Sequence, residues 1–280
     1  MPLTFSTHAQ NAHHQFQIVS DLHLEIAPNN TSYTLFTIPP RAPHLALLGD
    51  IGVPATQDPL TGPLASFLRR HLLTFTTIFL HPRQPRSLPL QMGRRRPLLR
   101  TLPEASGSAV GEFIYLQKGR YDFSEDAVTV LGCTLFSRIP SGEFQQLGLG
   151  LNDFHLTTSW TPRQHARAHE EHLGWLNGQV RELEGSGRKV VVFTHYAPTK
   201  DERTVEERHW GSVLQSGFST DLSGEACWTA GEVTVWAFGH THFNCDFVDG
   251  LGKKVVTNQK GYDFQGRGTA GWDPEKVVEV

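Results

Sequence analysis

The sequence predicts an α/β fold, because short apolar runs of strand length alternate with helical segments along most of its 280 residues. Residues 190–193 form a continuous apolar run, which is typical of a strand buried on both faces of its sheet. Several of the other apolar runs end in Asp or His. The length and apolar content are sufficient for a sizeable core, and we expect one domain covering residues 1–280.

The bulk properties exclude several classes of protein. The formal net charge is −3, so no overall field favours nucleic acid or an acidic membrane. The three cysteines, Cys133, Cys227 and Cys245, show no CxxC spacing and suit a reducing compartment. The first 17 residues lack the apolar stretch of a signal peptide, and no apolar run approaches the roughly 20 residues of a membrane helix. We expect a cytoplasmic protein without membrane contact, and the oligomeric state stays open.

The first two strand-like runs each end in a carboxylate. Residues 16–20 read as a buried strand that continues into Asp21-Leu22-His23. After a Pro, Asn and Thr-rich loop at 27–43, the apolar run 44–48 ends in Gly49-Asp50. In an extended chain, side chains two positions apart point the same way, so Asp21 and His23 are expected to face one site. The alternative for both is an ordinary turn at the end of a strand.

The pattern breaks after the third strand-like run. Residues 63–74 fit a helix and 76–80 a strand, but a segment rich in Pro, Leu and Arg follows, at about 81–110. It includes Arg94-Arg95-Arg96 and has no periodicity. A basic run can bind nucleic acid. This one lacks interleaved aromatic residues, so we expect a solvated loop and no nucleic-acid partner.

The next region contains the helix that the sequence predicts most clearly. Strands are expected at 113–116 and 128–136, and a helix at 161–184. Thr161 fits the N-cap, Pro162 the first helical position and Gln164 the partner position of a capping box. Three histidines occur on this helix with ligand-like spacing, but no acidic residue completes an HExxH motif. We expect a helix packed on the core, with these histidines partly exposed: His165, His169 and His172.

Two more strand ends carry histidine. The run 190–193 leads into Thr194-His195, and after a long loop at 199–232 the run 233–238 leads into Gly239-His240-Thr241-His242. Glycine before the His-x-His pair permits a close approach of the backbone. Residues 245–248 and 254–257 fit a closing pair of strands.

Together the strand ends predict a metal centre. Ligands of open α/β sheets gather at the carboxyl ends of the strands. The side chains expected there form a mixed oxygen and nitrogen set that suits Mn, Fe or Zn: Asp21, His23, Asp50, His195, His240 and His242. Six ligands are too many for one tetrahedral ion with an open position, and they fit two ions about 4 Å apart. Such a pair favours phosphoryl chemistry.

This order of motifs, Asp21-x-His23, Gly49-Asp50, His195 and Gly239-His240-x-His242, resembles the calcineurin-like metallophosphoesterases, including small fungal members of unassigned substrate. The resemblance spans residues 16–262. It implies two mixed β-sheets packed face to face as a sandwich with flanking helices.

The resemblance also implies roles for the six residues. Asp21, His23 and His242 would hold one metal, a divalent or trivalent transition ion. His195 and His240 would hold a second ion, and Asp50 would bridge the two. A metal-bound hydroxide would attack a phosphate ester, and we expect catalysis to depend above all on Asp50 and His195.

One motif of the family is missing. After its third strand the family has Gly-Asn-His-Asp/Glu, in which the Asn binds the second metal and the His lies over the phosphate. No Asn occurs here between Asp50 and Asn152. We therefore expect the second metal to bind weakly. The alternative function is a catalytically impaired metal-binding protein.

The genetic code offers an explanation for the missing motif. When codons for Gly-Asn-His-Glu are read one base out of phase, each position can encode only a few residue types. Arg83-Gln84-Pro85-Arg86 matches the allowed types at all four positions. We interpret the segment at about 81–110 as a frameshifted reading. Sequencing the transcript tests this, and the idea fails if codons 83–86 are other than NGG, CAA, CCA and CGA.

The substrate, and the choice between phosphate monoester and diester, are not readable from the sequence. Asn152 and His155 are candidates to line the site, with a structural role equally expected.

Overall fold

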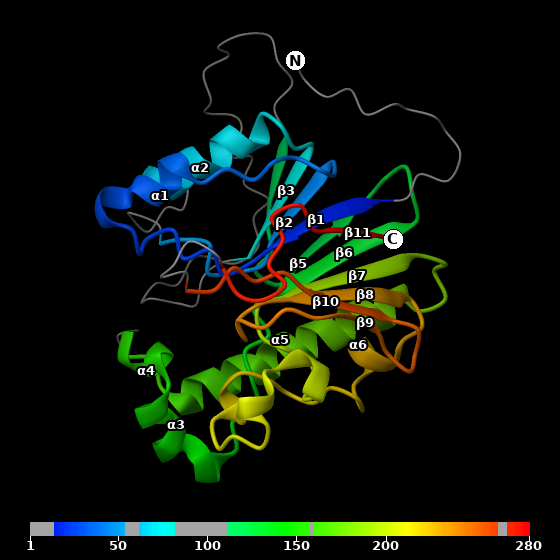
Figure 1. The fold of residues 1–280 in the computed structure, drawn as a ribbon. Helices are drawn as coiled ribbons and strands as arrows, with labels where there is room; N and C mark the ends of the chain where they lie inside the picture. Colours follow the sequence, from blue (N-terminus) through cyan, green and yellow to red (C-terminus); the bar gives the residue numbers. More distant parts are fainter. Residues whose placement is uncertain (1–13, 54–61, 82–110, 157–158, 263–267) are drawn as a thin grey trace.

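The computed structural model describes residues 14–53, 62–81, 111–156, 159–262 and 268–280, without the side chains of Asn152 and Leu156. The atypical segment lies outside these residues from position 82 to position 110, and so does its Arg94-Arg95-Arg96 run. The described chain forms two mixed β-sheets with flanking helices, as the sequence led us to expect (Figure 1).

The first sheet has the order β11-β1-β2-β3-β4. Its three central pairings, β1 with β2, β2 with β3 and β3 with β4, are parallel, and β11 pairs with β1 antiparallel. The parallel strands therefore bring their carboxyl ends to one edge. The strands are β1 (Gln15–Val19), β2 (His44–Leu47), β3 (Thr77–Leu80), β4 (Glu112–Tyr115) and β11 (Val277–Glu279).

The second sheet has the order β5-β6-β7-β8-β10-β9. The pairings of β6 with β7, β7 with β8 and β8 with β10 are parallel, whereas β5 and β9 pair antiparallel at the two edges. The strands are β5 (Gly119–Asp122), β6 (Val128–Cys133), β7 (Lys189–Thr194), β8 (Val233–Phe238), β9 (Asp246–Val248) and β10 (Lys254–Thr257).

The sheets pack against each other through alternate residues of their strands. Ile18 and Phe193 belong to the cluster between the sheets, whereas their neighbours Val19 and Val192 belong to the clusters on the outer faces. Because side chains alternate between the faces of a strand, both faces of each sheet are apolar, which explains the continuous apolar runs in the sequence.

Helices cover the outer faces (Figure 1). Against the first sheet lie α1 (Thr31–Leu35) and α2 (Gly62–Leu72), and against the second lie α5 (Pro162–Leu183) and α6 (Ala226–Thr229). Helix α5 begins as expected, with Thr161 as N-cap and the reciprocal bonds of a capping box to Gln164. Two short helices, α3 (Phe144–Gly150) and α4 (Asn152–Leu156), precede it.

Parts of the expected loops are ordered into short helices. The 27–43 loop contains α1 and the 3-10 turn Pro28–Asn30. The 199–232 loop contains α6 and the 3-10 turns Glu202–Thr204, Glu207–His209 and Gln215–Gly217. Another 3-10 turn, Ser141–Glu143, precedes α3.

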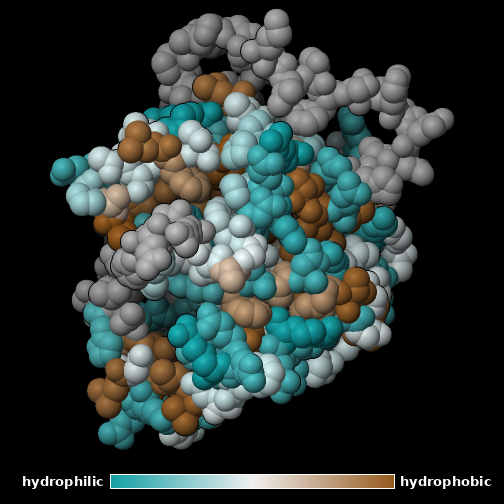
Figure 2. Space-filling view, in the orientation of Figure 1, coloured by the Kyte–Doolittle hydropathy of each residue, from teal (hydrophilic) through white to brown (hydrophobic). Residues whose placement is uncertain are grey.

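Among the described residues, no helix combines the length and the apolar character needed to cross a bilayer. On the face shown in Figure 2, hydrophilic residues cover much of the surface, and hydrophobic residues gather at the end occupied by α3 and α4. Leu149 of α3 is among the exposed large apolar side chains.

Candidate metal centre

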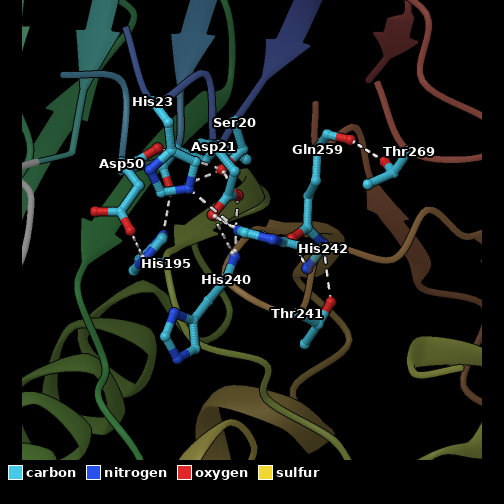
Figure 3. Close-up of polar contacts among 12 residues, drawn as sticks. Ser20, Asp21, His23, Asp50, His195, His240, Thr241, His242, Gln259 and Thr269 are labelled. Carbon is cyan, nitrogen blue, oxygen red and sulfur yellow. Dashed lines mark hydrogen bonds and ion pairs between the residues drawn. The ribbon is translucent and has the colours of Figure 1, made fainter. Parts of the chain in front are cut away.

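The carboxyl ends of four parallel strands bring the six predicted side chains together in two groups (Figure 3). Strands β1 and β8 supply the first group, and β2, β7 and β8 supply the second. Within each group, the potential ligand atoms all lie within 4.8 Å of one another. The first group is Asp21, His23 and His242, and the second is Asp50, His195 and His240.

The backbone at these residues is not extended. Five of the six residues have φ between 46° and 70°, and His195 is the exception. We expected residue pairs such as Asp21 and His23 to face one site through strand alternation, and this reason was wrong. The chain instead turns through left-handed conformations, which are uncommon outside glycine and are concentrated at functional sites. The five residues are Asp21, His23, Asp50, His240 and His242.

Two glycines permit the groups to approach each other. A Cβ atom on Gly49 would collide with the ring of His195, and φ at Gly49 is +99°. A Cβ on Gly239 would collide with the hydroxyl of Ser20 and the carboxylate of Asp21. Larger residues at these positions would push the strand ends apart, so both glycines are part of the site.

The first group has the spacing of ligands around one ion. The Nε2 atoms of His23 and His242 lie 3.2 Å apart, and Asp21 Oδ1 lies 3.4 Å from His242 Nε2. Atoms that each lie about 2.1 Å from one metal are about 3.0–3.4 Å apart in octahedral and tetrahedral arrangements. The first group therefore fits a metal ion without rearrangement of its side chains.

The chain itself holds this arrangement in place. The Ser20 hydroxyl donates to Asp21 Oδ2 (2.5 Å), and the backbone N–H of His240 donates to the same oxygen (3.1 Å). The backbone N–H of His242 donates to Gln259 Oε1 (2.6 Å). Such bonds to the backbone and to the carboxylate orient ligands before a metal arrives.

The electrostatics of the first group favour a charged carboxylate. Burial alone would raise the pKa of the Asp21 carboxyl, but the hydrogen bond from His242 and the nearby ring of His195 hold this pKa well below its usual range. Burial would lower the pKa of His242, and its contact with Asp21 raises it instead. Asp21 is therefore an anion at neutral pH and suits a cation.

In the second group, the two histidines present unbonded nitrogens. His195 donates from Nδ1 to the carbonyl of Leu48 (2.9 Å), which leaves Nε2 as the nitrogen with a lone pair, 3.8 Å from Asp50 Oδ2. Within the described residues, Nε2 of His195 and Nε2 of His240 are buried and have no hydrogen-bond partner. Buried polar atoms of this kind call for a ligand, and neutral imidazole nitrogens suit a transition metal.

His240 is held between aromatic rings. Its ring centroid lies 4.0 Å from that of Tyr196 and 5.1 Å from that of Phe218. Burial, and then the neighbouring His195, lower the pKa of His240 well below its usual value, so the ring is neutral at pH 7. The charge of Asp50 also reaches His242 of the first group, where it helps to raise the pKa of that ring.

The three histidines of α5 take no part in the centre, and the expectation that they are partly exposed was wrong. All three are buried. They bond the backbone of residues 135–137: Leu135 N–H donates to His172 Nδ1, Ser137 N–H donates to His165 Nε2, and His169 Nδ1 donates to the Leu135 carbonyl. Leu135 and Phe136 have positive φ values, so these histidines hold an irregular turn beyond β6.

His81 occupies the strand end where the sequence lacks the expected motif. It follows β3, is buried, and packs its ring against Gly132. Neither ring nitrogen makes a hydrogen bond of normal geometry within the described residues, and the Phe193 backbone and the His195 ring are its polar neighbours. Burial lowers the pKa of His81 to about 3, so an uncharged ring fills an apolar position.

Two residues near the second group were not predicted. Tyr196 is buried, and its hydroxyl donates to Asp153 Oδ2 (3.1 Å), which lies 4.0 Å from His240 Nε2. Asp153 lies on the short helix α4, where no motif marks it. The other candidate on this helix, His155, is exposed and bonds the Leu149 carbonyl, and the side chain of Asn152 lies outside the described residues.

The chain has a distant relative of similar length among known proteins. No protein-family model matches the chain. An uncharacterized protein of Acanthamoeba polyphaga mimivirus is 24% identical over 270 residues, which cover 88% of this chain and 91% of that protein.

Solved structures that are similar to this chain include two hydrolases. A dimetal phosphatase from Danio rerio aligns with a TM-score of 0.45 and 12% identity over 88% of this chain and 87% of its own, which is too distant to carry an argument. The phosphopantetheinyl hydrolase of Mycobacterium tuberculosis aligns with a TM-score of 0.61 and 15% identity over 96% of both chains. This protein therefore has the α/β fold of that hydrolase, with two mixed sheets and flanking helices.

Proposed function

We propose that this protein hydrolyses a phosphate ester at a dinuclear metal centre formed by the two groups. The observation that carries the proposal is the pair of adjacent three-residue groups, each with its ligand atoms within 4.8 Å. The likeness of the fold to a hydrolase of phosphopantetheinyl groups is consistent with it. When bound, two such ions would activate a water molecule and neutralise the charge of the phosphate in an in-line displacement.

The residues of the chain prepare the site for this reaction. Asp21 brings a buried negative charge to the first group, and Asp50 adds a second carboxylate, to which we assign the bridge between the two ions. The bond from His195 Nδ1 to the Leu48 carbonyl fixes that ring, so its Nε2 faces the centre. The left-handed turns direct side chains of both sheets to one place, and this geometry positions the ligands without help from a substrate.

A second candidate function is a metal-binding protein with little or no catalysis. The missing Gly-Asn-His-Asp/Glu motif favours it, because the second ion then lacks an amide ligand and the phosphate lacks a histidine.

Two measurements separate these functions. The metal content per chain is determined after equilibration with Mn²⁺ and removal of the excess, and hydrolysis is measured with an aryl phosphate monoester and an aryl phosphate diester. Two ions per chain together with metal-dependent turnover support the phosphoesterase. One ion per chain and no turnover of either ester would favour the second candidate.

A further inference from the structure

The second group is short of ligands. It contributes three ligands, one carboxylate and two imidazoles. A four-coordinate ion held entirely by protein ligands requires four. The asparagine that supplies an amide oxygen in the resembling family has no counterpart in the sequence between Asp50 and Asn152. A carboxylate from outside the group lies beside the unbonded Nε2 atom of His240: Asp153 Oδ2, at 4.0 Å.

We propose that Asp153 supplies an oxygen ligand to the second metal ion, and that Tyr196 positions its carboxylate for this role. The inference rests on the proposed dinuclear centre and goes beyond the six residues that the strand ends provide. Asp153 comes from α4, outside both sheets, so it completes the site from a different element.

The distance permits this role. Two ligands that each lie about 2.1 Å from one ion are separated by at most about 4.2 Å. The 4.0 Å between Asp153 Oδ2 and His240 Nε2 is within this limit, but Asp153 lies outside the set of residues whose ligand atoms all approach within 4.8 Å, so its carboxylate has to turn toward the ion. The side chain of Asp153 is 24% exposed, so it also has room to approach the ion by rotation about its own bonds.

Tyr196 connects the two ligands. Its ring packs on the ring of His240, with centroids 4.0 Å apart, and its hydroxyl donates to Asp153 Oδ2. Tyr196 is fully buried, so both contacts are fixed by the core rather than by the surface. A hydrogen bond to a ligating carboxylate orients it and typically affects metal affinity about 10- to 100-fold.

The charge balance also favours a carboxylate here. An imidazole ligand brings no negative charge to an ion, so Asp50 is the source of negative charge among the three residues of the second group. Asp153 adds a second negative charge beside a divalent or trivalent ion. The other use of Asp153 would be to bind a polar group of the substrate, and in that case its removal would leave metal binding unchanged.

The experiment measures Mn²⁺ binding rather than turnover. Wild type, Asp153→Ala, Asp153→Asn and Tyr196→Phe are titrated with Mn²⁺ alone, and the bound metal is counted by mass spectrometry. Electron paramagnetic resonance reports whether two ions are close enough to couple. Glu171→Gln is the control, because it removes one negative charge from an exposed position on α5.

We expect two ions and a coupled signal in wild type and in Glu171→Gln. Asp153→Ala should bind one ion and lose the coupled signal. Asp153→Asn, which keeps an oxygen, should bind the second ion with reduced affinity, and Tyr196→Phe should bind it about tenfold more weakly. The affinity of the first site, within the same molecules, should not change.

Three results would overturn the inference. Two ions with unchanged affinity in Asp153→Ala would exclude a ligand role and leave the proposed function intact. Loss of both ions from a variant with a native circular dichroism spectrum would show that the effect is not specific to the second site. One ion in the wild type would overturn both the inference and the dinuclear function.

Discussion

The two ligand groups are built from the same strand ends but differ in how they are supported. In the first, the carboxylate of Asp21 is fully buried and accepts hydrogen bonds from Ser20 and from the His240 backbone. In the second, the carboxylate of Asp50 is partly exposed, and the Nε2 atoms of His195 and His240 have no partner among the described residues.

This difference indicates what each group contributes without a metal. In the first group a buried carboxylate is satisfied by hydrogen bonds from Ser20 and the His240 backbone, so its removal should destabilise the fold. The second group leaves buried nitrogens without hydrogen bonds. Binding of a ligand should therefore stabilise this group more than the group, without a ligand, stabilises the fold. Changes in the first group should therefore affect stability, and changes in the second should affect binding and catalysis.

The largest effect is expected from Asp50→Asn. A carboxylate shared by two ions contributes several kcal/mol to the stabilisation of charge in the transition state, which corresponds to about 1000-fold in rate. We expect turnover of an aryl phosphate ester to fall by at least this factor and the coupled signal of two ions to disappear. The rate and the metal content are measured on the same samples. A fully active variant would remove Asp50 from between the ions.

A comparison of Asp21→Asn with Asp50→Asn in chelator-treated protein tests the asymmetry itself. Removal of one partner from a buried charge pair costs about 3–5 kcal/mol, and the amide keeps part of the hydrogen bonding, so we expect Asp21→Asn to lose about 3 kcal/mol. For the less buried Asp50 we expect a loss below about 1 kcal/mol. Urea unfolding gives both values. Equal losses would contradict the difference between the groups.

The α5 histidines extend the comparison to imidazoles that each bond the backbone through one ring nitrogen. Burial lowers the pKa of His165 and of His172 to about 3. In the unfolded chain these rings take up a proton below pH 6.5, whereas in the folded chain they stay neutral. Their contribution to stability is therefore complete above pH 6.5 and is lost as the pH falls toward 3, by up to about 1.4 kcal/mol per pH unit for each ring.

Urea unfolding of the metal-free protein at pH 7, 6 and 5 measures this loss. His172→Asn keeps an acceptor for the Leu135 N–H but cannot take up a proton in this range. We expect its stability to depend less steeply on pH than that of the wild type. Identical slopes would show that burial of His172 does not control this dependence.

The smallest effect is expected at His81, which follows β3 and has no ligand role. Its ring is buried without a hydrogen bond of normal geometry, so His81→Leu should raise the free energy of unfolding by about 1–2 kcal/mol. The matched control is His71→Leu. His71 is equally buried, but it accepts from the Ile38 N–H and donates to the Phe67 carbonyl, so this change should be destabilising. Destabilisation by both changes would mean that the His81 ring is favourable where it lies.

The sequence predicted the α/β class and most strands, because buried parallel strands leave continuous apolar runs. Strands β5 and β11 were not predicted. Both are short edge strands that pair along one side only, so β5 (Gly119–Asp122) leaves no apolar run. The packing of the two sheets followed from the family resemblance and not from periodicity, since residue spacing does not encode which sheets meet.

For the site, the six residues of the two groups were predicted because each directly follows a strand or its glycine. The sequence did not predict that left-handed turns bring these side chains together, because such turns at Asp, His and Asp-x-His positions leave no periodic pattern in the sequence. Asp153 and Tyr196 were missed for different reasons. Tyr196 follows a ligand directly and could have been suspected, whereas Asp153 approaches through tertiary packing of α4 and has no local signal.

The distance along the chain between the ligands has a consequence for how the metal enters. His23 and His242 of the first group are separated by 219 positions and follow strands of different sheets, so their contact requires that the two sheets pack together. Contacts of such long range form slowly during folding, because loop closure is costly. We therefore expect the metal to bind a chain that is already folded, which makes metal loading a separate, later step in maturation.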